Sequence, residues 1–407
     1  MHEGYDALLF DLDGVVYRGD DPVPGAAEVL QQLRTAGATI RFLTNNSART
    51  PDQVAERLIR MGMKADPGEV VTSAGATAAL LRREGVTGSA FVIGERGIRT
   101  ALADIGIEVV EGAPERADLV VVGWDRELTY DRLRTAALLI QRGARLVATN
   151  ADATYPAPDG LWPGGGAILA AVVTATGAKP TVVGKPSRPM FEAAVEAVGA
   201  TRPLVIGDRL DTDVAGAAAM GWDSLLVLTG ASRSEDLLLA SALPTYLAPG
   251  LQVLLEARPP ARPRLAQPAD ADAVEALLGA SGLSATEAAA SIGDGWTVIL
   301  SPADAPPATA AVAPLDGEWG LLRSVATDPR SRGAGLGTLA VAAAAARARE
   351  RGLRSLALFT ESAERFFAQL GFTPAARADL PPSVRATPQA VECTSATAMA
   401  RRITGAD

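Results

Sequence analysis

Short aliphatic and β-branched runs alternate with amphipathic helical stretches over roughly the first 250 residues, and this alternation restricts the fold more than any other feature. Residues 7–12 and 39–44 are predicted to be strands, and residues 26–36 and 51–61 helices. Alternation of this kind is typical of βαβ units, which assemble into a mostly parallel α/β sheet. Ligands bind such sheets at the carboxyl ends of the strands. Further strands of this region are predicted at 145–149, 181–183, 204–206 and 224–228.

A proline-rich segment, ARPPARPRLAQP at residues 257–268, is expected to act as a semi-rigid linker. Beyond it the alternation resumes and indicates a separate domain of about 120 residues. The residues after Pro381 show no regular pattern and are expected to be irregular. Strands of this domain are predicted at 296–300, 309–312, 320–326 and 355–360, and helices near 269–278, from residue 338 and near 362–370.

Histidine and cysteine are almost absent, which narrows the chemistry available to the chain. The 407 residues include one cysteine, Cys393, and one histidine, His2. An internal disulfide framework, a cysteine-ligated zinc site and Ser-His-Asp or Cys-His catalysis are therefore excluded. The net charge of −9 argues against nucleic acid as a partner. No apolar run reaches the ~18 residues of a membrane span and residues 1–10 lack a signal-peptide pattern, so a cytoplasmic protein is expected.

Two aspartates follow the first predicted strand, in the sequence Asp11-Leu12-Asp13-Gly14. The alternation of side chains along a strand places both carboxylates on one side of its end. Two carboxylates this close can share a divalent cation, and one can attack a substrate while the other moves a proton. In isolation, the same pattern is more often an acidic turn.

Three further strand ends carry polar residues. The second strand ends in Thr44-Asn45, whose hydroxyl and amide can donate to phosphate oxygens, although a polar turn would look the same. Lys185 follows the strand at 181–183 and is one of only three lysines beside 35 arginines. Three aspartates follow the strand at 204–206, which is electrostatically unfavourable unless a cation or hydrogen-bond donors offset them. These aspartates are Asp208, Asp211 and Asp213.

In order and character, these four motifs resemble those of the haloacid dehalogenase (HAD) superfamily of phosphohydrolases. The resemblance implies that Asp11 is the nucleophile that takes up the phosphoryl group. It implies that Asp13 is the general acid for the leaving alkoxide and then the base for the attacking water. Thr44 and Asn45 would hold the transferring phosphoryl group, and Lys185 would offset the charge on the nucleophile and the phosphate.

The same resemblance, which covers residues 1–256, implies a Mg²⁺ site. The ion would be bound by Asp11, by the backbone carbonyl of Asp13 and by Asp208. Asp213 would support the waters of the metal or Lys185, and Asp211 is a weaker candidate for either role. Mg²⁺ prefers oxygen ligands and keeps several waters, so few carboxylates suffice.

About 140 residues separate the second motif from Lys185, which is far more than a βαβ crossover needs. This insertion resembles the large α/β cap of the nitrophenylphosphatase-like subgroup, including the stretch Thr149-Asn150-Ala151-Asp152 and the glycines around Gly165. Asn150, Asp152 and Gly165 are therefore candidates for substrate contact or for the domain interface, with an ordinary loop as the alternative. The turn Arg126-Glu127 is a weaker cap candidate. Caps of this subgroup often form dimers, so a homodimer through the cap is expected.

The second domain contains a basic, glycine-rich turn that opens a long alanine-rich helix. It resembles the acetyl-CoA pyrophosphate loop of the GNAT acetyltransferases, with Arg332, Gly333, Gly335 and Gly337 at the loop positions. Backbone N–H groups at a helix N-terminus bind phosphates well. Residues 365–372 resemble the closing motif of that family, and the likeness covers about residues 262–378. Acetyl-CoA is the cofactor that this resemblance implies.

The sequence does not decide whether the second domain is an active acetyltransferase. All five tyrosines lie outside it, and Phe367 stands where GNAT members often carry the tyrosine that reprotonates the CoA thiolate. Glu361, Glu364 and Asp328 are possible bases, but nothing in the sequence distinguishes them. An acetyltransferase and an inactive module that senses acyl-CoA or mediates interactions are both compatible with these residues.

Together these features predict a Rossmann-like HAD core with an inserted α/β cap and a GNAT-like α/β domain. The predicted function is the Mg²⁺-dependent hydrolysis of a small-molecule phosphate ester through an aspartyl-phosphate. The two-domain arrangement and the alanine- and arginine-rich composition resemble those of actinobacterial phosphatases that act on glycerol 3-phosphate, with phosphoglycolate, pyridoxal phosphate and nucleoside monophosphates as alternatives. The expected segments are the core (1–75 and 181–256), cap (76–180), linker (257–268), GNAT-like domain (262–385) and tail (386–407).

Overall fold

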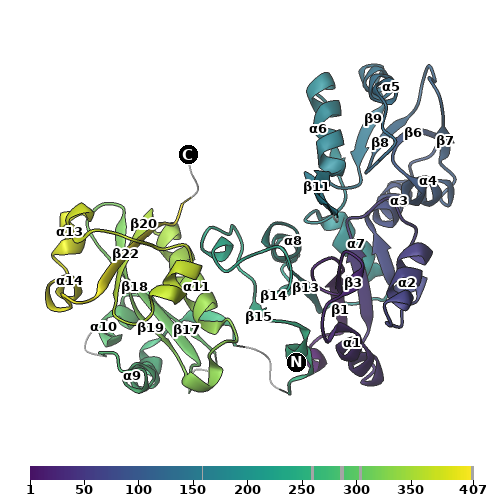
Figure 1. Cartoon of the computed structure of the whole chain (residues 1–407). Coiled ribbons are helices and arrows are strands. Elements are labelled where there is room, and N and C mark those ends of the chain that lie inside the picture. The colour runs from purple at the N-terminus through teal and green to yellow at the C-terminus, as the bar shows by residue number, and fades with distance from the viewer. Residues whose placement is uncertain (158, 258–260, 285–287, 302–304, 405–407) are drawn as a thin grey trace. The chain divides into compact units, whose positions relative to one another are not determined.

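The computed structural model describes residues 1–157, 159–257, 261–284, 288–301 and 305–404 (Figure 1). The described residues form two compact units. The first unit holds Met1–Ser224 and Leu254–Ala257, and the second holds Leu225–Val253 and the described residues after Ala257. In the described part of the chain, no helix is both long enough and apolar enough to cross a membrane.

The core of the first unit is a parallel sheet with strands in the order β13-β1-β4-β5. Every residue of β4 is buried, and so are four of the five residues of β1, because helices cover both faces of the sheet. The parallel α/β core predicted from the alternation is therefore confirmed. The strands are β1 (Ala7–Asp11), β4 (Ile40–Thr44), β5 (Val70–Thr72) and β13 (Pro203–Gly207), and the helices are α1 (Ala26–Thr35), α2 (Pro51–Arg60), α3 (Ser73–Arg83), α7 (Arg188–Glu196) and α8 (Ala215–Met220).

Local sequence explains where the core helices begin. The Thr50 hydroxyl caps α2 by accepting a hydrogen bond from the Gln53 N–H, and the Gln53 Oε1 accepts one from the Thr50 N–H. Pro51 occupies the first helical position, where a missing N–H does no harm. Thr72 ends β5 and caps α3 in the same way, through the Gly75 N–H. The chain thus turns from strand to helix directly beside the carboxyl ends of the strands.

The cap, within the first unit, is a second parallel sheet with the strand order β12-β9-β8-β6-β7. Helices α5 and α6 pack on one face of it, and α3 and α4 share an apolar cluster that contains residues of both the cap and the core sheets. The strands are β6 (Ser89–Ile93), β7 (Glu108–Val110), β8 (Leu119–Val122), β9 (Arg145–Ala148) and β12 (Thr181–Val182), and the helices are α4 (Arg96–Ala103), α5 (Tyr130–Gln141) and α6 (Gly165–Thr176).

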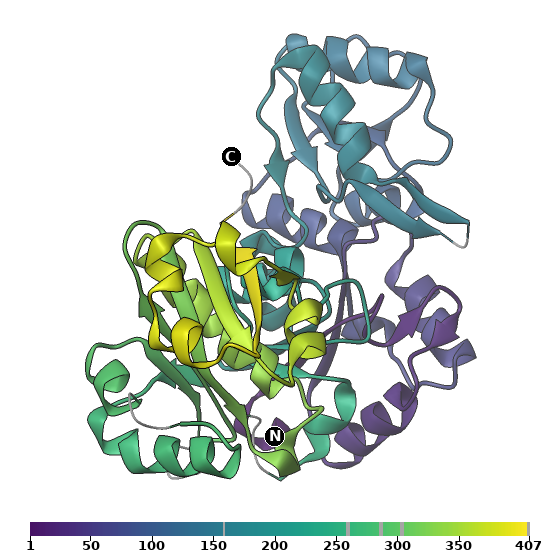
Figure 2. The same ribbon diagram turned by 60° about the vertical axis from the view of Figure 1, so that its left-hand side comes forward.

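An antiparallel hairpin projects from the cap (Figure 2, teal). It consists of β10 (Thr154–Ala157) and β11 (Gly160–Pro163), and it directly precedes α6. The sequence alternation did not predict it, because prolines interrupt both strands. Tyr155 pairs with Trp162 across the hairpin, so its two aromatic residues belong to the same ladder.

The second unit contains a mixed sheet with the order β16-β17-β18-β19-β20-β22-β21. All neighbouring strands are antiparallel except β19 and β20, and the ladder between these two includes only three residue pairs. The strands are β16 (Pro263–Leu265), β17 (Thr297–Leu300), β18 (Ala308–Pro314), β19 (Trp319–Thr327), β20 (Ser355–Thr360), β21 (Thr373–Pro374) and β22 (Thr397–Arg402), and the helices are α9 (Ala271–Ala280), α10 (Ala288–Gly293), α11 (Leu336–Glu350), α12 (Glu364–Gln369), α13 (Pro382–Arg385) and α14 (Pro388–Glu392).

The expectation of an irregular chain after Pro381 is wrong. Strand β22 lies between β20 and β21 in the sheet and pairs with all six residues of β20. Ala398 and Met399 are buried, and this short apolar run was too brief to indicate a strand by periodicity alone. The proline-rich segment also differs from a simple linker: residues 258–260 lie outside the described residues, and Pro263–Leu265 forms the edge strand β16.

Residues 225–253 group with the second unit, although the sequence placed a boundary after Glu256. This segment contributes η4 (Asp236–Leu238) and β15 (Tyr246–Ala248), which pairs with β14 (Asp223–Val227). Leu237 and Leu238 are fully buried, and Arg349 at the end of α11 donates hydrogen bonds to the carbonyls of Leu238 and Ala240. Helix α11 therefore packs directly on this segment.

Candidate active site

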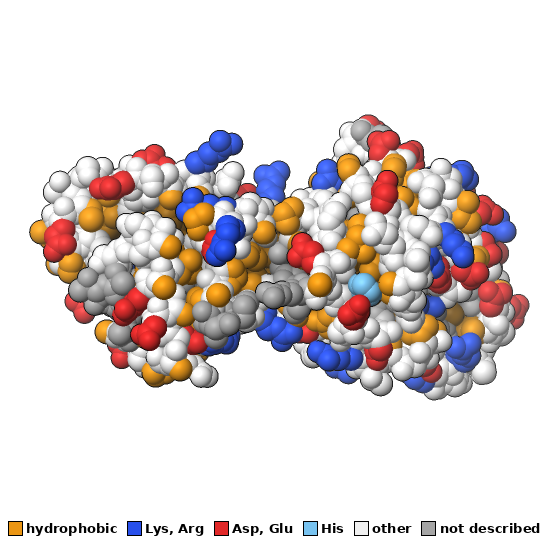
Figure 3. Space-filling model, turned by 90° about the horizontal axis from the view of Figure 1, so that it is seen from below, with side chains coloured by type: hydrophobic (Ala, Val, Ile, Leu, Met, Phe, Trp, Pro, Cys, Tyr) orange, Lys and Arg blue, Asp and Glu red, His pale blue; other side chains and the backbone are white. Residues whose placement is uncertain are grey.

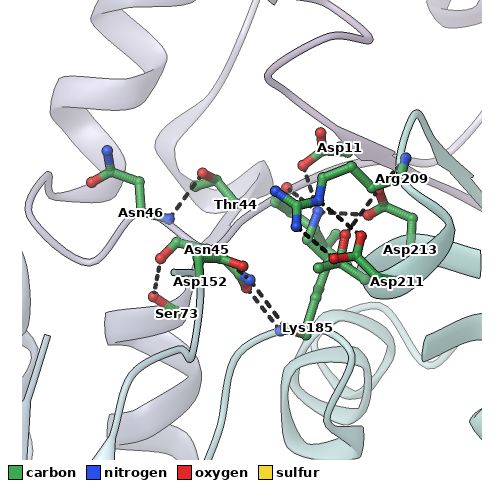
Figure 4. A network of polar contacts seen from close by, with 12 residues as sticks. Asp11, Thr44, Asn45, Asn46, Ser73, Asp152, Lys185, Arg209, Asp211 and Asp213 are labelled. Atoms are coloured by element: carbon green, nitrogen blue, oxygen red, sulfur yellow. Dashed lines mark hydrogen bonds and ion pairs between the residues drawn. The ribbon is translucent and has the colours of Figure 1, made fainter. Parts of the chain in front are cut away.

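Three neighbouring core strands end in polar residues at one edge of the sheet. Asp11 is the last residue of β1, Thr44 the last residue of β4, and Asp208 follows the end of β13. Strand β1 lies between the other two, and all three are parallel, so their carboxyl ends meet. Figure 4 shows Asp11 and Thr44 in the polar network that forms there.

Lys185 connects the acidic residues of this network. Its ammonium group forms ion pairs with Asp11 and, at 2.7 Å, with Asp213, and it lies 3.4 Å from the Leu43 carbonyl oxygen (Figure 4). Only 3% of its side chain is exposed. Burial opposes a charged ammonium group, but the carboxylates of Asp11 and Asp213 outweigh it and raise the pKa of Lys185. Lys185 therefore remains protonated beside the predicted nucleophile.

Three buried carboxylates surround a position suited to a metal ion. Asp11, Asp208 and Asp213 each offer one oxygen atom within 4.8 Å of the other two. Burial raises the pKa of Asp11; Lys185 opposes this rise, and the charges of Asp213 and Asp208 add to it. One ammonium group cannot neutralise three buried carboxylates. The donor set thus fits a hard divalent cation, which prefers carboxylate oxygens.

A glycine allows Asp213 to approach the end of β13. A Cβ atom on Gly207 would lie 2.2 Å from the Asp213 Cβ, which no real structure tolerates. Asp213 lies in η3 (Leu210–Val214), a π-helical turn of a type often found at functional sites. The close approach brings the Asp213 carboxylate within reach of Lys185.

Asp13 lies just beyond the strand end and is suited to proton transfer. Burial raises the pKa of its carboxyl group, while the positive charges of Arg57, Lys185 and Arg49 oppose the rise. This upward shift in pKa is in the direction that a general acid requires. Arg57 is held in place by the Gly19 carbonyl and lies 4.3 Å from the centre of the Tyr17 ring.

Asn45 links the core to the cap (Figure 4). Its amide oxygen accepts a hydrogen bond from the Lys185 N–H at 2.8 Å, and its Nδ2 donates to the Lys185 carbonyl at 3.1 Å and to Asp152 at 3.0 Å. The Thr44 hydroxyl accepts from the Asn46 N–H at 3.1 Å. The side chain of Asn45 thus positions Lys185, and the predicted contacts of Thr44 and Asn45 with a phosphoryl group stay predictions.

The predicted cap residues lie against this link. Asn150 donates to the Asn45 carbonyl at 2.8 Å, and a Cβ on Gly165 would lie 3.1 Å from the Asn150 amide oxygen. Asp152 accepts from Asn45, and burial raises the pKa of its carboxyl group despite that bond and the charge of Arg209. These three residues therefore lie at the junction of core and cap, beside Lys185.

The two weaker candidates have partners of their own. Asp211 accepts two hydrogen bonds from Arg209, at 3.0 and 2.7 Å, and 68% of its side chain is exposed. Arg126 forms a two-bond ion pair with Glu95. The backbone N–H of Glu127 donates to Asp125.

Two aromatic residues near the site were missed by the sequence analysis. Trp124, in the loop after β8, stacks on Tyr155 of the cap hairpin with ring centres 4.1 Å apart. Burial, and next the charge of Asp13, raises the pKa of the Tyr155 hydroxyl, so Tyr155 lies within electrostatic range of Asp13. Aromatic residues make up only 4% of the chain, and that rarity could have drawn attention to an aromatic residue directly after a strand.

The only histidine plays no part in this network. His2 belongs to the N-terminal turn η1 (His2–Gly4), and its Nδ1 lies 3.0 Å from the Leu254 carbonyl oxygen. Its side chain is the pale-blue group on the face seen in Figure 3. Carboxylates and Lys185 therefore carry the acid–base chemistry of this site.

The predicted pyrophosphate loop of the second unit connects β19 to α11. Gly333 and Gly335 have φ angles of 82° and 80°, a left-handed backbone that favours glycine. Gly335 precedes the first turn of the fifteen-residue helix α11, and no side chain caps that turn. The Arg332 Nε donates to the Thr327 carbonyl at 3.4 Å. A Cβ on Gly337 would lie 2.8 Å from the Thr327 hydroxyl, so the loop packs closely on β19.

The three possible bases of the second unit are all engaged. Glu361 accepts a hydrogen bond from Ser395 at 2.9 Å, Glu364 accepts one from Thr397, and Asp328 pairs with Arg330 at 3.0 Å. Each carboxylate is thus held by a neighbour within its own unit. This arrangement does not single out any of the three as a catalytic base.

Sequence comparison agrees with the geometry of both units. The profile of the haloacid dehalogenase-like hydrolases matches residues 8–108, and an HAD-hydrolase-like profile matches residues 182–254. The acid sugar phosphatase of Staphylococcus epidermidis is 37% identical over 253 residues, which cover 62% of this chain and 97% of that protein. The chain belongs to the haloacid dehalogenase-like hydrolases. It is a phosphatase, as the active-site motifs predicted.

Solved structures place this HAD phosphatase among similar enzymes. The glycerol phosphate phosphatase of Mycobacterium tuberculosis in complex with calcium is 31% identical, with a TM-score of 0.70, over 91% of this chain and 97% of that one. The p-nitrophenyl phosphatase of Archaeoglobus fulgidus is 33% identical, with a TM-score of 0.59, over 62% and 99%. The profile of the acetyltransferase (GNAT) family matches residues 295–372, so the phosphatase carries a GNAT-like domain.

Proposed function

We propose that this HAD phosphatase hydrolyses glycerol 3-phosphate to glycerol and inorganic phosphate. The observation that carries the proposal is the likeness to the M. tuberculosis glycerol phosphate phosphatase, which extends over 91% of the chain and so includes both domains. The acid sugar phosphatase matches only 62% of the chain. A substrate shared with the two-domain relative is therefore favoured over a sugar phosphate.

The proposed reaction has two steps at Asp11. In the first, the Asp11 carboxylate attacks phosphorus, the bond from phosphorus to the glycerol oxygen breaks, and Asp13 gives its proton to that oxygen. In the second, water attacks the phosphorus of the aspartyl-phosphate, Asp13 takes up a proton from the water, and inorganic phosphate leaves Asp11. The buried ammonium group of Lys185 offsets the negative charge of Asp11 and of the phosphoryl group.

Asp11, Asp208 and the backbone carbonyl of Asp13 are the proposed ligands of Mg²⁺, with Asp213 in support. The M. tuberculosis enzyme has been solved in complex with magnesium and with calcium, which supports a divalent ion at this carboxylate set. When bound, Mg²⁺ supplies Lewis-acid polarisation of the phosphoryl oxygens. Asp213 itself accepts a hydrogen bond from Lys185 at 2.7 Å, so it also positions the lysine.

The cap is proposed to read the leaving group. Tyr155 stacks on Trp124 and lies within electrostatic range of Asp13, the proposed proton donor to the leaving oxygen. Aromatic faces pack well against the C–H groups of a small polyol. Asn150 and Asp152 tie the same part of the cap to Asn45, so cap position and phosphoryl binding are linked.

A substrate panel tests this proposal. We expect the kcat/KM for glycerol 3-phosphate, with Mg²⁺ present, to exceed that for phosphoglycolate, pyridoxal phosphate, a nucleoside monophosphate and a sugar phosphate by about tenfold or more. A preference for any of the other four esters would replace glycerol 3-phosphate as the substrate and leave the phosphatase assignment intact.

For the GNAT-like domain we propose acyl-CoA binding without acetyl transfer. The glycine loop at the start of α11 and the short ladder between β19 and β20 support a pyrophosphate and pantetheine site, whereas Glu361, Glu364 and Asp328 are all paired. Calorimetric titration of the full chain with acetyl-CoA should give binding, and no CoA should be released with a panel of amines. Release of CoA would establish an acetyltransferase. Absence of acetyl-CoA binding would contradict both the acyl-CoA-binding and the acetyltransferase hypotheses.

A further inference from the structure

A cavity of about 380 Å³ lies where the core and the cap meet within the first unit. Four arginines and two glutamates line it, which leaves an excess of two positive charges in a protein whose net charge is −9. The core supplies Arg49, Glu56 and Arg60, and the cap supplies Glu95, Arg96 and Arg126. A concave site of one sign concentrates ions of the opposite sign.

Two of these six charges neutralise each other. Arg126 donates to Glu95 through Nε at 2.7 Å and through Nη2 at 2.8 Å. These hydrogen bonds, more than the partial burial that opposes them, lower the pKa of Glu95, so the pair stays ionised. The opposite charges of Arg126 and Glu95 therefore neutralise each other within the wall of the cavity.

The other three arginines have no such partner. Among the residues that the structure describes, Arg49, Arg60 and Arg96 form no ion pair, and neither does Glu56, although it lies one helical turn from Arg60. Three arginines without an ion pair in the described part of the chain therefore line the cavity, beside one glutamate that has none either. Guanidinium groups match the geometry of carboxylate, sulfate and phosphate oxygens.

The two walls of the cavity are fixed against each other. The Gly97 N–H, at the start of α4, donates to the Ala48 carbonyl at 2.8 Å. A Cβ on Gly97 would lie 2.5 Å from the carbonyl oxygens of Arg49 and Ser47, so only glycine permits this contact. Arg49 and Arg96 are thereby held on opposite sides of one narrow junction.

The cavity also adjoins the catalytic site. Arg49 lies in the loop that connects Thr44, at the end of β4, to α2. Its backbone N–H donates a hydrogen bond to the Asn46 side chain at 3.2 Å. The Arg126 guanidinium lies 5.3 Å from the centre of the Trp124 ring, which stacks on Tyr155. One wall of the cavity thus contacts the Trp124–Tyr155 stack that we propose to read the leaving group.

We propose that this cavity is a second anion site, in which Arg49, Arg60 and Arg96 bind a carboxylate, sulfate or phosphate group from both the core and the cap. The anion could be a second acidic group of the substrate or a free small anion, and both have the same chemistry at this position. The proposal does not depend on glycerol 3-phosphate being the substrate, because binding at this cavity can be measured without turnover.

Calorimetric titration with sulfate tests the site, with Mg²⁺ and orthovanadate first filling the phosphoryl site. Wild type should bind sulfate, the double variant Arg60→Gln/Arg96→Gln should bind it about tenfold more weakly, and Glu56→Gln, which removes the unpaired carboxylate, should bind it more tightly. Arg82→Gln, on an exposed part of α3 away from the cavity, is the matched control and should behave as wild type. Absence of sulfate binding, or equal affinity in all four proteins, would overturn the proposal.

Kinetics distinguish the two sources of the anion. If the substrate supplies it, Arg60→Gln/Arg96→Gln should raise the KM for a phosphorylated carboxylic acid about tenfold more than the KM for glycerol 3-phosphate. If a free anion binds, sulfate should change the kcat/KM of wild type for any ester and should have a smaller effect in the double variant. No difference between wild type and the double variant in either measurement would contradict the proposed site.

Discussion

At the scale of single residues, one buried lysine organises the acidic groups of the active site. Lys185 pairs with Asp11 and Asp213, and its backbone is held by the side chain of Asn45. A buried carboxylate left without such a partner would be strongly destabilising. Lys185 thus opposes the rise in pKa that burial imposes on Asp11, the proposed nucleophile, while burial also raises the pKa of Asp13.

Replacement of Asp13, the proposed general acid, gives a test that compares leaving groups. Asp13→Asn should lower kcat for glycerol 3-phosphate about 10²–10⁴-fold, because the alkoxide then leaves without a proton. p-Nitrophenolate needs no proton to leave, so p-nitrophenyl phosphate should still give a rapid burst of p-nitrophenol followed by slow turnover. Stopped-flow absorbance measures this burst. Equal losses for both esters, with no burst, would assign another role to Asp13.

At the scale of secondary-structure elements, close-packed glycines and helix N-caps position the proposed catalytic residues. A Cβ on Gly207, the last residue of β13, would lie 2.2 Å from the Asp213 Cβ. Thr72 ends β5 and caps α3, and Thr50 caps α2 after the loop that follows β4. These features depend on local sequence. They convert an ordinary βαβ edge into a site with four acidic groups and one lysine.

The close approach at Gly207 makes a sharp prediction. Gly207→Ala should displace Asp213 from Lys185 and lower Mg²⁺-dependent phosphate release about 10²-fold, since a shift of roughly 1 Å at a catalytic group has this effect. Gly279→Ala is the control, because a Cβ at Gly279 meets nothing within 4 Å. The idea fails if Gly207→Ala folds, as judged by circular dichroism, and retains the activity of the control.

The carboxyl group of Glu69, in the turn η2 (Pro67–Glu69), is expected to make a pH-dependent contribution to the free energy of unfolding. Burial favours neutral Glu69, but hydrogen bonds from Arg34 at 2.5 and 2.7 Å and from the Asp66 N–H outweigh it and lower the pKa of Glu69 below its ordinary value of 4.5. A carboxyl group whose pKa is lowered by folding stabilises the folded state at pH values above its ordinary pKa. This contribution is lost as the pH falls through the pKa that the group has in the folded state.

We therefore expect Glu69→Gln to lower the free energy of unfolding at pH 7 by about 1 kcal/mol, a modest value because water screens the pair. The difference from wild type should shrink as the pH falls below 4.5. Urea unfolding at several pH values measures it, with Glu108→Gln, an exposed carboxylate of β7, as the control. A difference that grows toward acidic pH would reverse the sign and contradict this account.

At the scale of the whole molecule, the phosphatase and GNAT-like sequences share a compact unit. Residues 225–253, matched by the HAD-hydrolase-like profile, pack against α11 of the GNAT-like domain. The Arg349 guanidinium binds two carbonyls of this segment, and Leu237 and Leu238 are fully buried. The phosphatase part is therefore not an independent unit that ends at the proline-rich segment.

A truncated chain tests whether residues 225–253 depend on their packing against α11. A protein that ends at Glu256 should lose the partner of Leu237 and Leu238, and each newly exposed leucine forfeits roughly 1.5–3 kcal/mol of burial. We expect a lower unfolding temperature and aggregation on heating, measured by differential scanning fluorimetry and light scattering. The milder Arg349→Ala should show a smaller shift in the same direction. A truncated protein as stable as the full chain would show that the segment does not need α11.

The sequence indicated much of this arrangement, and the exceptions have physical reasons. Alternation predicted the parallel core, and residues at strand ends predicted Asp11, Lys185 and Asp208, because the carboxyl ends of parallel strands must meet. The stacking of Trp124 on Tyr155 depends on a hairpin that no periodicity marks. Strand β22 was missed because its buried stretch is too short for pattern recognition.

The measurement that tests the central claim most directly is phosphate release from glycerol 3-phosphate and p-nitrophenyl phosphate, with and without Mg²⁺, by wild type, Asp11→Asn and Asp211→Asn. Wild type should be active only with the metal, and Asp11→Asn should be inactive toward both esters, because it lacks the attacking carboxylate. Asp211→Asn should keep most of the wild-type rate, since Asp211 is exposed and paired with Arg209. Metal-dependent release that survives in Asp11→Asn would contradict the assignment of the nucleophile.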